Sequence, residues 1–145
     1  MMGRMGKIES LCRISPIRHI RLIGLIGLLS LMACGKLSPE EQASLAAKGY
    51  YEHLIEGEWD AYLEGVNGTE GAPADYVEQL RASAKQYVQR LKQLHQGVQS
   101  IEVASARTDS MLQCTQVFLI LNFGDATHEE ICVPMVECNG RWRMK

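Results

Sequence analysis

Cysteine is the residue type in this sequence with the widest chemistry, and five are present, at positions 12, 34, 114, 132 and 138. A thiolate can act as a nucleophile, ligate zinc or enter a disulfide. Cys132 and Cys138 lie on one predicted strand about 20 Å apart at 3.3 Å per residue, too far for a disulfide. The close spacing of Cys and His ligands that zinc sites show is missing. We therefore interpret Cys114, Cys132 and Cys138 as free thiols that pack as small hydrophobic side chains, and we expect neither a metal nor a cofactor.

Residues 128–130, with the sequence His-Glu-Glu, form the polar cluster best suited to acid–base work. A histidine beside carboxylates can move a proton near neutral pH. These residues directly follow a predicted turn, where charged side chains normally face water. We interpret them as a solvated cluster, and we expect a protein without catalytic residues that is not an enzyme.

Aromatic side chains at helical spacing, together with a tryptophan near the C-terminus, form the third group with chemical potential. Such side chains can build a core or line a ligand pocket, because tyrosine and tryptophan combine a large apolar body with a polar atom. Both interpretations stay open at this point. The candidate pocket-lining residues are Tyr50, Tyr51, Trp59, Tyr62, Tyr87 and Trp142.

The N-terminal segment has the pattern of an export signal. Residues 1–21 are basic and polar, and they run into Leu22–Ala33, an uncharged stretch of twelve residues rich in Leu and Ile. A membrane-spanning helix needs about 20 apolar residues, whereas the apolar core of a signal peptide needs about 7–15. The segment 1–33 is therefore predicted to be a signal peptide.

The signal ends in Leu31-Met32-Ala33-Cys34-Gly35, which resembles the lipobox of bacterial lipoproteins. The resemblance implies cleavage before Cys34, a diacylglycerol on its sulfur and acylation of the new amino terminus. Two or more acyl chains anchor a protein stably, because each buried methylene contributes about 0.8 kcal/mol. Residues 34–38 then form a lipidated tether in the bacterial cell envelope. Since Gly35 stands where an aspartate would favour the inner membrane, the expected address is the outer membrane of a cell that has two.

Residues 39–145 are expected to form a single α+β domain, since a chain of 145 residues supports only one core. Ser38-Pro39-Glu40-Glu41 is a capping-box helix start. A first helix is predicted from Pro39 to about Gly57, a short second one over 59–66, and a long third one over 75–95 that covers one face of a sheet. The intervening segment 67–74 has the composition of a loop.

Strand patterns follow the helices. A short, weak strand is predicted around residues 101–103, then strands over 113–122, 130–138 and 141–145. Gly124-Asp125 is predicted to be a two-residue turn, and Asn139-Gly140 is a strong signal for a hairpin of the same length. The sheet is thus an antiparallel meander of about four strands.

Two segments, YYEHLIEGEW (50–59) and VPMVECNGRWRM (133–144), resemble the opening and the terminal hairpin of small bacterial lipoproteins in the nuclear transport factor 2-like (cystatin-like) superfamily. This resemblance implies N-terminal helices packed into a bent antiparallel sheet. The shared motifs are structural and imply no catalytic residue. The domain itself is one of unknown function in those lipoproteins.

The net charge of the predicted mature chain helps to exclude some classes of partner. Residues 34–145 hold 10 basic and 16 acidic side chains, a formal charge of −6 that disfavours nucleic acid as a partner. We expect a membrane-anchored envelope lipoprotein with a non-catalytic binding or structural domain. The alternative is a small-molecule binding protein, or an enzyme, that uses the cavity between helices and sheet. A cavity of a few hundred Å³ with a buried acid or histidine would favour the alternative.

The predicted turns also fix which strand residues share a face. They place Cys114 opposite Met135 and Cys132 opposite Val117, and two sets of residues on opposite faces. The core set is Phe118, Ile120, Ile131, Val133, Met135, Trp142 and Met144. The outer set is Val117, Leu119, Leu121, Cys132, Pro134, Val136 and Cys138. Because so apolar an outer face usually marks a contact, we expect a homodimer or an envelope protein partner there. A bulge that shifted the strand register by one residue would exchange the two sets, and both faces would still be apolar.

Overall fold

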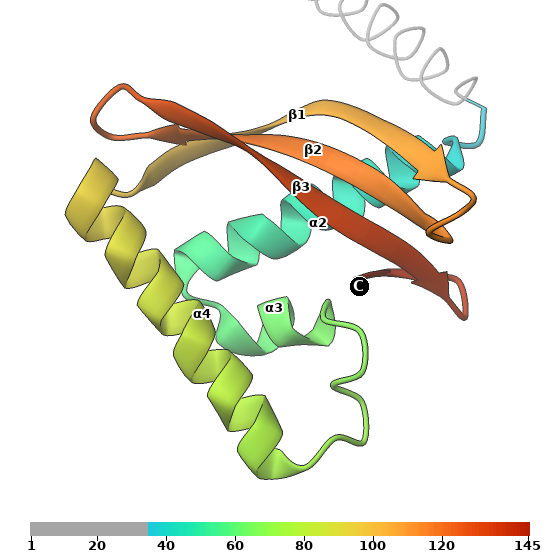
Figure 1. Ribbon diagram of the computed structural model, residues 1–145, viewed down its shortest axis with the longest axis horizontal. Helices are drawn as coiled ribbons and strands as arrows, with labels where there is room; N and C mark the ends of the chain where they lie inside the picture. Colours follow the sequence, from blue (N-terminus) through green and yellow to red (C-terminus); the bar gives the residue numbers. More distant parts are fainter. Residues whose placement is uncertain (1–34) are drawn as a thin grey trace, which may run out of the picture. The chain divides into compact units, whose positions relative to one another are not determined.

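The computed structural model describes residues 35–145; the signal segment and Cys34 lie outside this range. Leu37–Lys145 form one compact unit. Three helices come first: α2 (Pro39–Glu56), α3 (Trp59–Glu64) and α4 (Ala74–His95). Four strands follow: β1 (Val98–Asp109), β2 (Cys114–Phe123), β3 (His128–Cys138) and β4 (Arg141–Met144). They form a twisted antiparallel sheet in the order β1-β2-β3-β4 (Figure 1), so the predicted α+β class is confirmed.

Helix α2 begins as its sequence predicts. The Ser38 side chain accepts a hydrogen bond from the backbone N–H of Glu41, whose carboxylate accepts one from the backbone N–H of Ser38. Pro39 occupies the first helical position, where its missing N–H costs nothing. The helix ends at Gly57, whose φ of 81° is a left-handed conformation that glycine adopts without strain. None of the helices within residues 35–145 is long and apolar enough to cross a membrane.

The helix that covers the sheet is α2, and not the long helix α4 as expected (Figure 1). The small residues Ala43 and Ala47 are fully buried on α2 and allow it to lie close against the strands. The apolar stripe of α4 is used differently, because Ala84 and Val88 pack with Leu54 in a second cluster between helices. Helix α4 reaches the core of the sheet through its C-terminal half, where Leu91 joins it.

Strand β1 is longer than the short strand predicted around residues 101–103, whereas β4 and its hairpin are as predicted. Strand β1 has twelve residues and two irregularities, between Val98 and Ser100 and between Val103 and Ser105, which hide its periodicity in the sequence. The terminal hairpin is confirmed: Cys138 pairs with Arg141 across the two-residue turn Asn139-Gly140, whose φ angles are 53° and 76°. Positive φ at both positions is the reason Asn-Gly favours this turn.

The turn between β2 and β3 has three residues, which corrects the predicted register by one. The backbone N–H of Phe123 donates to the carbonyl of Thr127 at 2.9 Å, and Ala126 has a φ of 68°. The backbone N–H of Ala126 also donates to the carbonyl of Phe123 at 3.2 Å, so a β-turn is followed by one left-handed residue. Val117 therefore pairs with Val133, and Thr115 rather than Cys114 with Met135. The three cysteines Cys114, Cys132 and Cys138 are free.

The shift exchanges the faces of β2 only. We call the face that α2 covers the inner face and the opposite one the outer face. Val117, Leu119 and Leu121 are completely buried on the inner face, so their expected outer position is wrong. Phe118 and Ile120, expected in the core, are half-buried on the outer face. The remaining expected members keep their faces: Ile131, Val133, Met135, Trp142 and Met144 pack in the core, and Cys132, Pro134, Val136 and Cys138 lie outside it.

Candidate functional site

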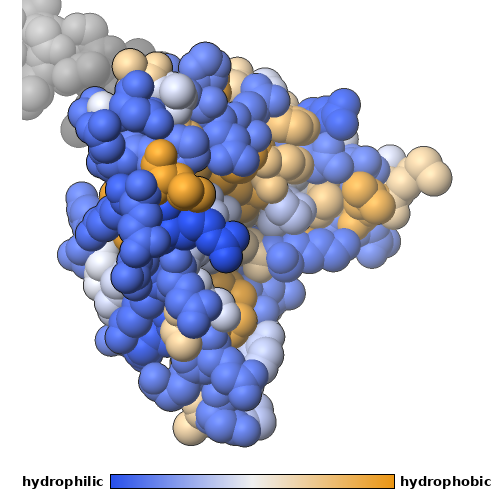
Figure 2. Space-filling model, turned by 60° about the vertical axis from the view of Figure 1, so that its left-hand side comes forward, coloured by the Kyte–Doolittle hydropathy of each residue, from blue (hydrophilic) through white to orange (hydrophobic). Residues whose placement is uncertain are grey.

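A cavity of about 350 Å³ lies among the three helices. Residues from all three helices line it, together with one residue that follows α3. They are Tyr51, Leu54, Tyr62, Leu63, Val66, Leu80, Ser83, Ala84 and Tyr87. We call this space the tyrosine cavity. The space-filling view shows a hollow beside α4 with hydrophobic residues in its depth and a hydrophilic rim (Figure 2).

Helical periodicity explains the lining. On α4, Leu80, Ala84 and Tyr87 are three or four residues apart and so share one face of the helix. On α2, Tyr51 and Leu54 are related in the same way. The break at Gly57 turns the chain, so that the short helix α3 can present Tyr62 to the same space.

The tyrosines of the cavity are arranged for polar contact within an apolar wall. Tyr51 and Tyr62 meet edge to face, with ring centroids 6.4 Å apart and an angle of 87°. Burial raises the pKa of both hydroxyls, and burial together with the charge of Glu129 raises the pKa of the Tyr87 hydroxyl. All three therefore stay neutral at physiological pH. Within residues 35–145, none of the three hydroxyls has a protein hydrogen-bond partner, in contrast to Tyr50, which donates to the carbonyl of Trp142 at 2.9 Å.

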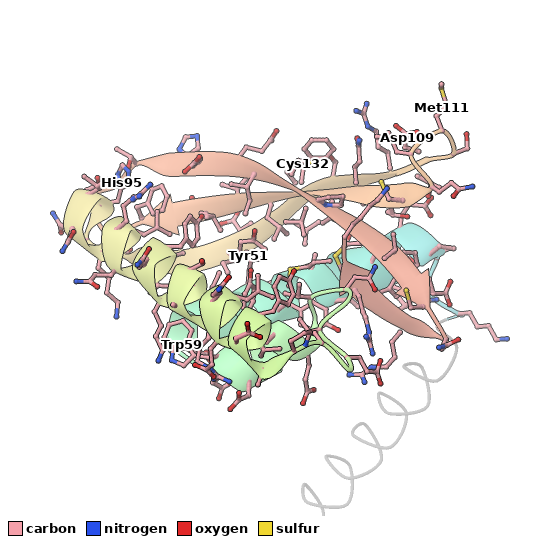
Figure 3. All side chains as sticks on the ribbon, turned by 60° about the horizontal axis from the view of Figure 1, so that its bottom comes forward. Tyr51, Trp59, His95, Asp109, Met111 and Cys132 are labelled. Atoms are coloured by element: carbon pink, nitrogen blue, oxygen red, sulfur yellow. The ribbon has the colours of Figure 1, made fainter. Side chains whose placement is uncertain are left out.

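Three of the six candidate aromatics line one cavity, Trp59 packs against the same helical cluster without lining it, and Tyr50 and Trp142 lie elsewhere. Tyr51, Tyr62 and Tyr87 line the tyrosine cavity. Tyr50 points instead toward β4, where its ring packs so close to Gly65 that a side chain at position 65 would collide with it. Trp59 lies at the junction of α2 and α3 (Figure 3), and the ammonium group of Lys85 lies 5.9 Å from its ring centroid. Trp142 packs against the core.

A second, more polar cavity of about 440 Å³ lies beside the first and shares Leu63 with it. Three arginines line it, each next to a carboxylate. Arg143 donates to Glu70 at 2.9 Å, Arg81 to Asp60 at 2.6 Å and to Glu78 at 3.0 Å, and Arg141 lies 3.9 Å from Glu64. The hydrogen bonds to Asp60 and Glu78 raise the pKa of Arg81. The sequence pattern does not predict this cavity, although Arg141 and Arg143 alternate around Trp142 and so lie on one face of a strand.

The His-Glu-Glu segment does not act as one cluster. His128 and Glu130 lie on the outer face, opposite Asn122 and Ile120, and both are exposed. Glu129 projects from the other face, near enough to Tyr87 to affect its titration. A different group, His53, Glu56 and Glu58, places three potential metal-ligand atoms within 4.8 Å of one another at the end of α2. His53 is half-buried and the two glutamates are exposed, and exposed acidic groups of this kind commonly bind no ion.

Comparison with known proteins identifies the fold. The chain matches no protein-family model and no curated protein sequence. It is similar to the crystal structure of a Campylobacter jejuni protein named as an NTF2-like transpeptidase, with a TM-score of 0.55 and 12% sequence identity. The match covers 68% of this chain and 92% of that one. At this identity the likeness shows the fold alone, and the domain is nuclear transport factor 2-like in architecture, as the sequence resemblance implied.

Proposed function

We propose that the protein is a membrane-anchored binding protein, held by lipid on Cys34, whose tyrosine cavity takes an uncharged small molecule. One observation carries the proposal. Three neutral tyrosines, whose hydroxyls have no hydrogen-bond partner among residues 35–145, line a largely apolar cavity of about 350 Å³. Small-molecule sites are typically cavities of about 300–1,000 Å³ with an apolar wall and a few convergent polar groups.

The lining determines what kind of ligand fits. Among the described residues, none that lines the tyrosine cavity carries a charge, and the negative charge of Glu129 acts on Tyr87 in its wall. A charged ligand would lose its hydration without gaining an ionic partner, and an anion would in addition be repelled. Tyrosine hydroxyls both donate and accept hydrogen bonds. The cavity therefore suits a neutral molecule with an apolar or aromatic body and hydroxyl, amide or carbonyl groups.

Binding is proposed in preference to catalysis. The name of the structural neighbour raises transpeptidation, which needs a nucleophile activated by a base. Ser83 is the only hydroxyl of the serine or threonine type among the residues that line the tyrosine cavity, and no histidine or carboxylate lines it. From the sequence, a cavity of a few hundred Å³ with a buried acid or histidine would favour a small-molecule binding protein or an enzyme. The volume of the tyrosine cavity meets the first part of this criterion, but none of the lining residues among those described is an acid or a histidine.

A ligand screen tests the proposal. The acylated full chain in detergent is screened against neutral small molecules for a rise in melting temperature, since a ligand that binds only the native state stabilises it. For each hit, Tyr51→Phe, Tyr62→Phe and Tyr87→Phe should each weaken binding about 2- to 13-fold, the loss of one hydrogen bond of 0.5–1.5 kcal/mol. Tyr76→Phe, at an exposed position of α4, is the matched control and should leave affinity unchanged. Hits that bind all three variants as well as the wild type would refute the proposal.

The anchor is tested separately. Cys34→Ala should abolish incorporation of an alkyne-labelled fatty acid and leave a precursor or a released protein, whereas the wild type should be labelled and fractionate with the outer membrane. Support for this part comes from the sequence: the short apolar stretch, the small residue at position 33 and Gly35 after the cysteine. A wild-type protein that takes up no label would refute the anchor and leave the cavity proposal standing.

A further inference from the structure

Large hydrophobic side chains are exposed mainly at one end of the domain. Seven are exposed within residues 35–145, and two of them, Tyr76 and Leu94, lie on α4. The other five belong to the start of α2, to β1 and to the turn between β1 and β2. They are Leu37, Leu45, Val103, Met111 and Leu112.

Hydrogen bonds hold the backbone of the turn between β1 and β2, which carries two of these side chains. The carboxylate of Asp109 accepts hydrogen bonds from the backbone N–H groups of Met111 and Leu112, both at 3.0 Å. The ammonium group of Lys145 donates to the carbonyl of Leu112 at 2.9 Å. The backbone of the turn is therefore tied to the protein, while the side chain of Met111 is 93% exposed and that of Leu112 is 51% exposed. This is a structured turn that presents apolar groups to the surroundings, as Figure 3 shows for Met111.

The same end carries the attachment point of the chain's N-terminal segment. Thr108 on β1 donates a hydrogen bond to Glu40 in the first turn of α2, so the two elements meet just before the turn that holds Met111. Leu37, Leu45 and Val103 line an apolar groove of about 410 Å³ between α2 and β1. Figure 1 shows the start of α2 and the β1–β2 turn at one end of the domain, away from α4.

Covalent geometry sets the distance to the anchor. Cys34 precedes Leu37 by three residues, which span at most about 10 Å when fully extended. A lipid on Cys34 would therefore hold this end of the domain against the bilayer. Glu40 and Glu41 also line the apolar groove between α2 and β1. Their carboxylates and that of Asp109 accept hydrogen bonds from Thr108, Ser38 and the turn and stay charged, so they would face the headgroup layer and not the acyl chains. Lys36 directly precedes Leu37 in the sequence and Lys145 contacts the turn, and both side chains suit anionic headgroups.

We infer that this end of the domain is a membrane-docking surface, in which Met111 and Leu112 enter the headgroup–acyl boundary and Leu37, Leu45 and Val103 rest on it. The inference builds on the proposed lipidation of Cys34. Apolar side chains at such an interface add to the anchoring by acyl chains and fix the orientation of the protein. Because α3 and α4 lie toward the other end in Figure 1, docking leaves the tyrosine cavity away from the lipid.

The test places a tryptophan at the tip of the turn. Full-length acylated Met111→Trp is reconstituted in vesicles of phosphatidylcholine and phosphatidylglycerol, with or without bromine on the acyl chains. The emission of the added tryptophan should shift to shorter wavelength and be quenched by the brominated lipids, after subtraction of the wild-type signal from Trp59 and Trp142. Gln79→Trp, at an exposed position of α4, is the matched control and should show neither effect.

Each other outcome contradicts the inference in a recognisable way. If the fatty-acid label is present but the emission of the added tryptophan stays at long wavelength and unquenched, the anchor holds and the docking surface is wrong. If the emission shifts without quenching by brominated lipid, a protein, including a second copy of this chain, covers the turn instead of the bilayer. If no label is incorporated and the protein leaves the vesicles, the anchor fails and the docking inference fails with it.

Discussion

The inner and outer faces of the sheet contrast most sharply on β2, where the sequence makes them look alike. Val117, Leu119 and Leu121 are fully buried beneath α2, whereas Phe118 and Ile120, which alternate with them, remain half-buried on the outer face. Every residue from 117 to 121 is hydrophobic, so the two faces of this strand have almost the same composition. The comparison teaches that a loop of the right length, rather than hydrophobicity, decides which set enters the core.

The outer face is also less apolar than predicted. In the actual register, Ile120 lies between Glu102 on β1 and Glu130 on β3. The guanidinium group of Arg107 lies 5.6 Å from the ring centroid of Phe118 and covers part of it. Polar neighbours therefore separate the hydrophobic side chains that the sequence placed in one continuous patch.

The largest expected effect comes from placing a charge on each face in turn. Leu119→Lys buries an unpaired ammonium group in the core and should destabilise the domain by about 5 kcal/mol or more, comparable to the whole stability of a small domain. Ile120→Lys, one residue away, places the same group between Glu102 and Glu130 and should change the stability by about 1 kcal/mol or less. Urea unfolding of both variants measures the difference, and equal losses would contradict the register.

Local signals explain why the ends of the elements could be predicted and the faces of β2 could not. Ser38 with Glu41, and Asn139 with Gly140, act through contacts within four residues, so the sequence contains the whole cause. The length of the β2–β3 turn depends on Ala126, a residue that gives no turn signal because it rarely adopts a positive φ.

The sequence predicts the three tyrosines of the candidate site but not how they come together, because helical spacing is a local signal. Helical spacing identifies Tyr51, Tyr62 and Tyr87 as members of apolar stripes, but it does not say which stripe faces which neighbour. Trp59 packs against the same cluster of Leu54, Ala84 and Val88 but does not line the cavity. The arginine-lined cavity joins residues from α3, α4 and β4 and has no local pattern that would reveal it.

Thiol reactivity gives the next largest contrast, between an exposed and a buried cysteine. Cys132 is exposed on the outer face, whereas Cys114 is buried and only 6% exposed. Cys132 should react with Ellman's reagent roughly 100-fold or more faster than Cys114, which is reached only when the sheet opens. In a Cys138→Ser background, which removes the half-buried third thiol, Cys132→Ser should remove the fast phase. If Cys114→Ser removes it instead, the assignment of these two thiols to buried and exposed positions is wrong.

Association of two copies through the outer face stays a prediction, now with different contacts. In the observed register a dimer would pair Phe118, Ile120 and Cys132 of one copy with those of another. Oxidation of isolated membranes should then crosslink Cys132 between copies, and Ile120→Glu should prevent the crosslink by adding a third carboxylate to those of Glu102 and Glu130. Leu94→Lys, at an exposed position of α4, is the control and should leave it intact. If oxidation yields no crosslinked dimer even for the wild type, the prediction of a homodimer through the outer face is wrong.

The turn that sets the register predicts a smaller effect of opposite sign. Ala126 has a φ of 68°, which costs an alanine about 1 kcal/mol and a glycine nothing. Ala126→Gly should therefore stabilise the domain by about 0.5–1 kcal/mol, after the greater chain entropy of glycine is included. Ala82→Gly, on the exposed side of α4, should destabilise it by about 1 kcal/mol. A loss of stability at both positions would contradict the three-residue turn.

The smallest expected effect is the pH dependence that Asp125 gives the same turn. Its carboxylate accepts hydrogen bonds from the hydroxyl of Thr127 at 2.5 Å, from the backbone N–H of Thr127 at 3.0 Å and from His95 at 3.0 Å. These contacts, the hydroxyl first, lower the pKa of Asp125 from 3.8 to about 2.

A carboxyl group whose pKa is lower in the folded than in the unfolded protein stabilises the fold above the unfolded pKa, and this contribution is lost as pH falls toward the folded pKa. The difference in melting temperature between the wild type and Asp125→Asn should thus be constant above about pH 4, and shrink as the pH falls from about 3.8 to about 2. Thr127→Val, which removes the hydroxyl but keeps the backbone donor, should move the midpoint of that loss to higher pH. Solvent reaches the carboxylate, so salt should weaken the effect. If the difference stays the same at every pH, the charge of Asp125 does not hold the turn, and the conformation of Ala126 must determine the register without it.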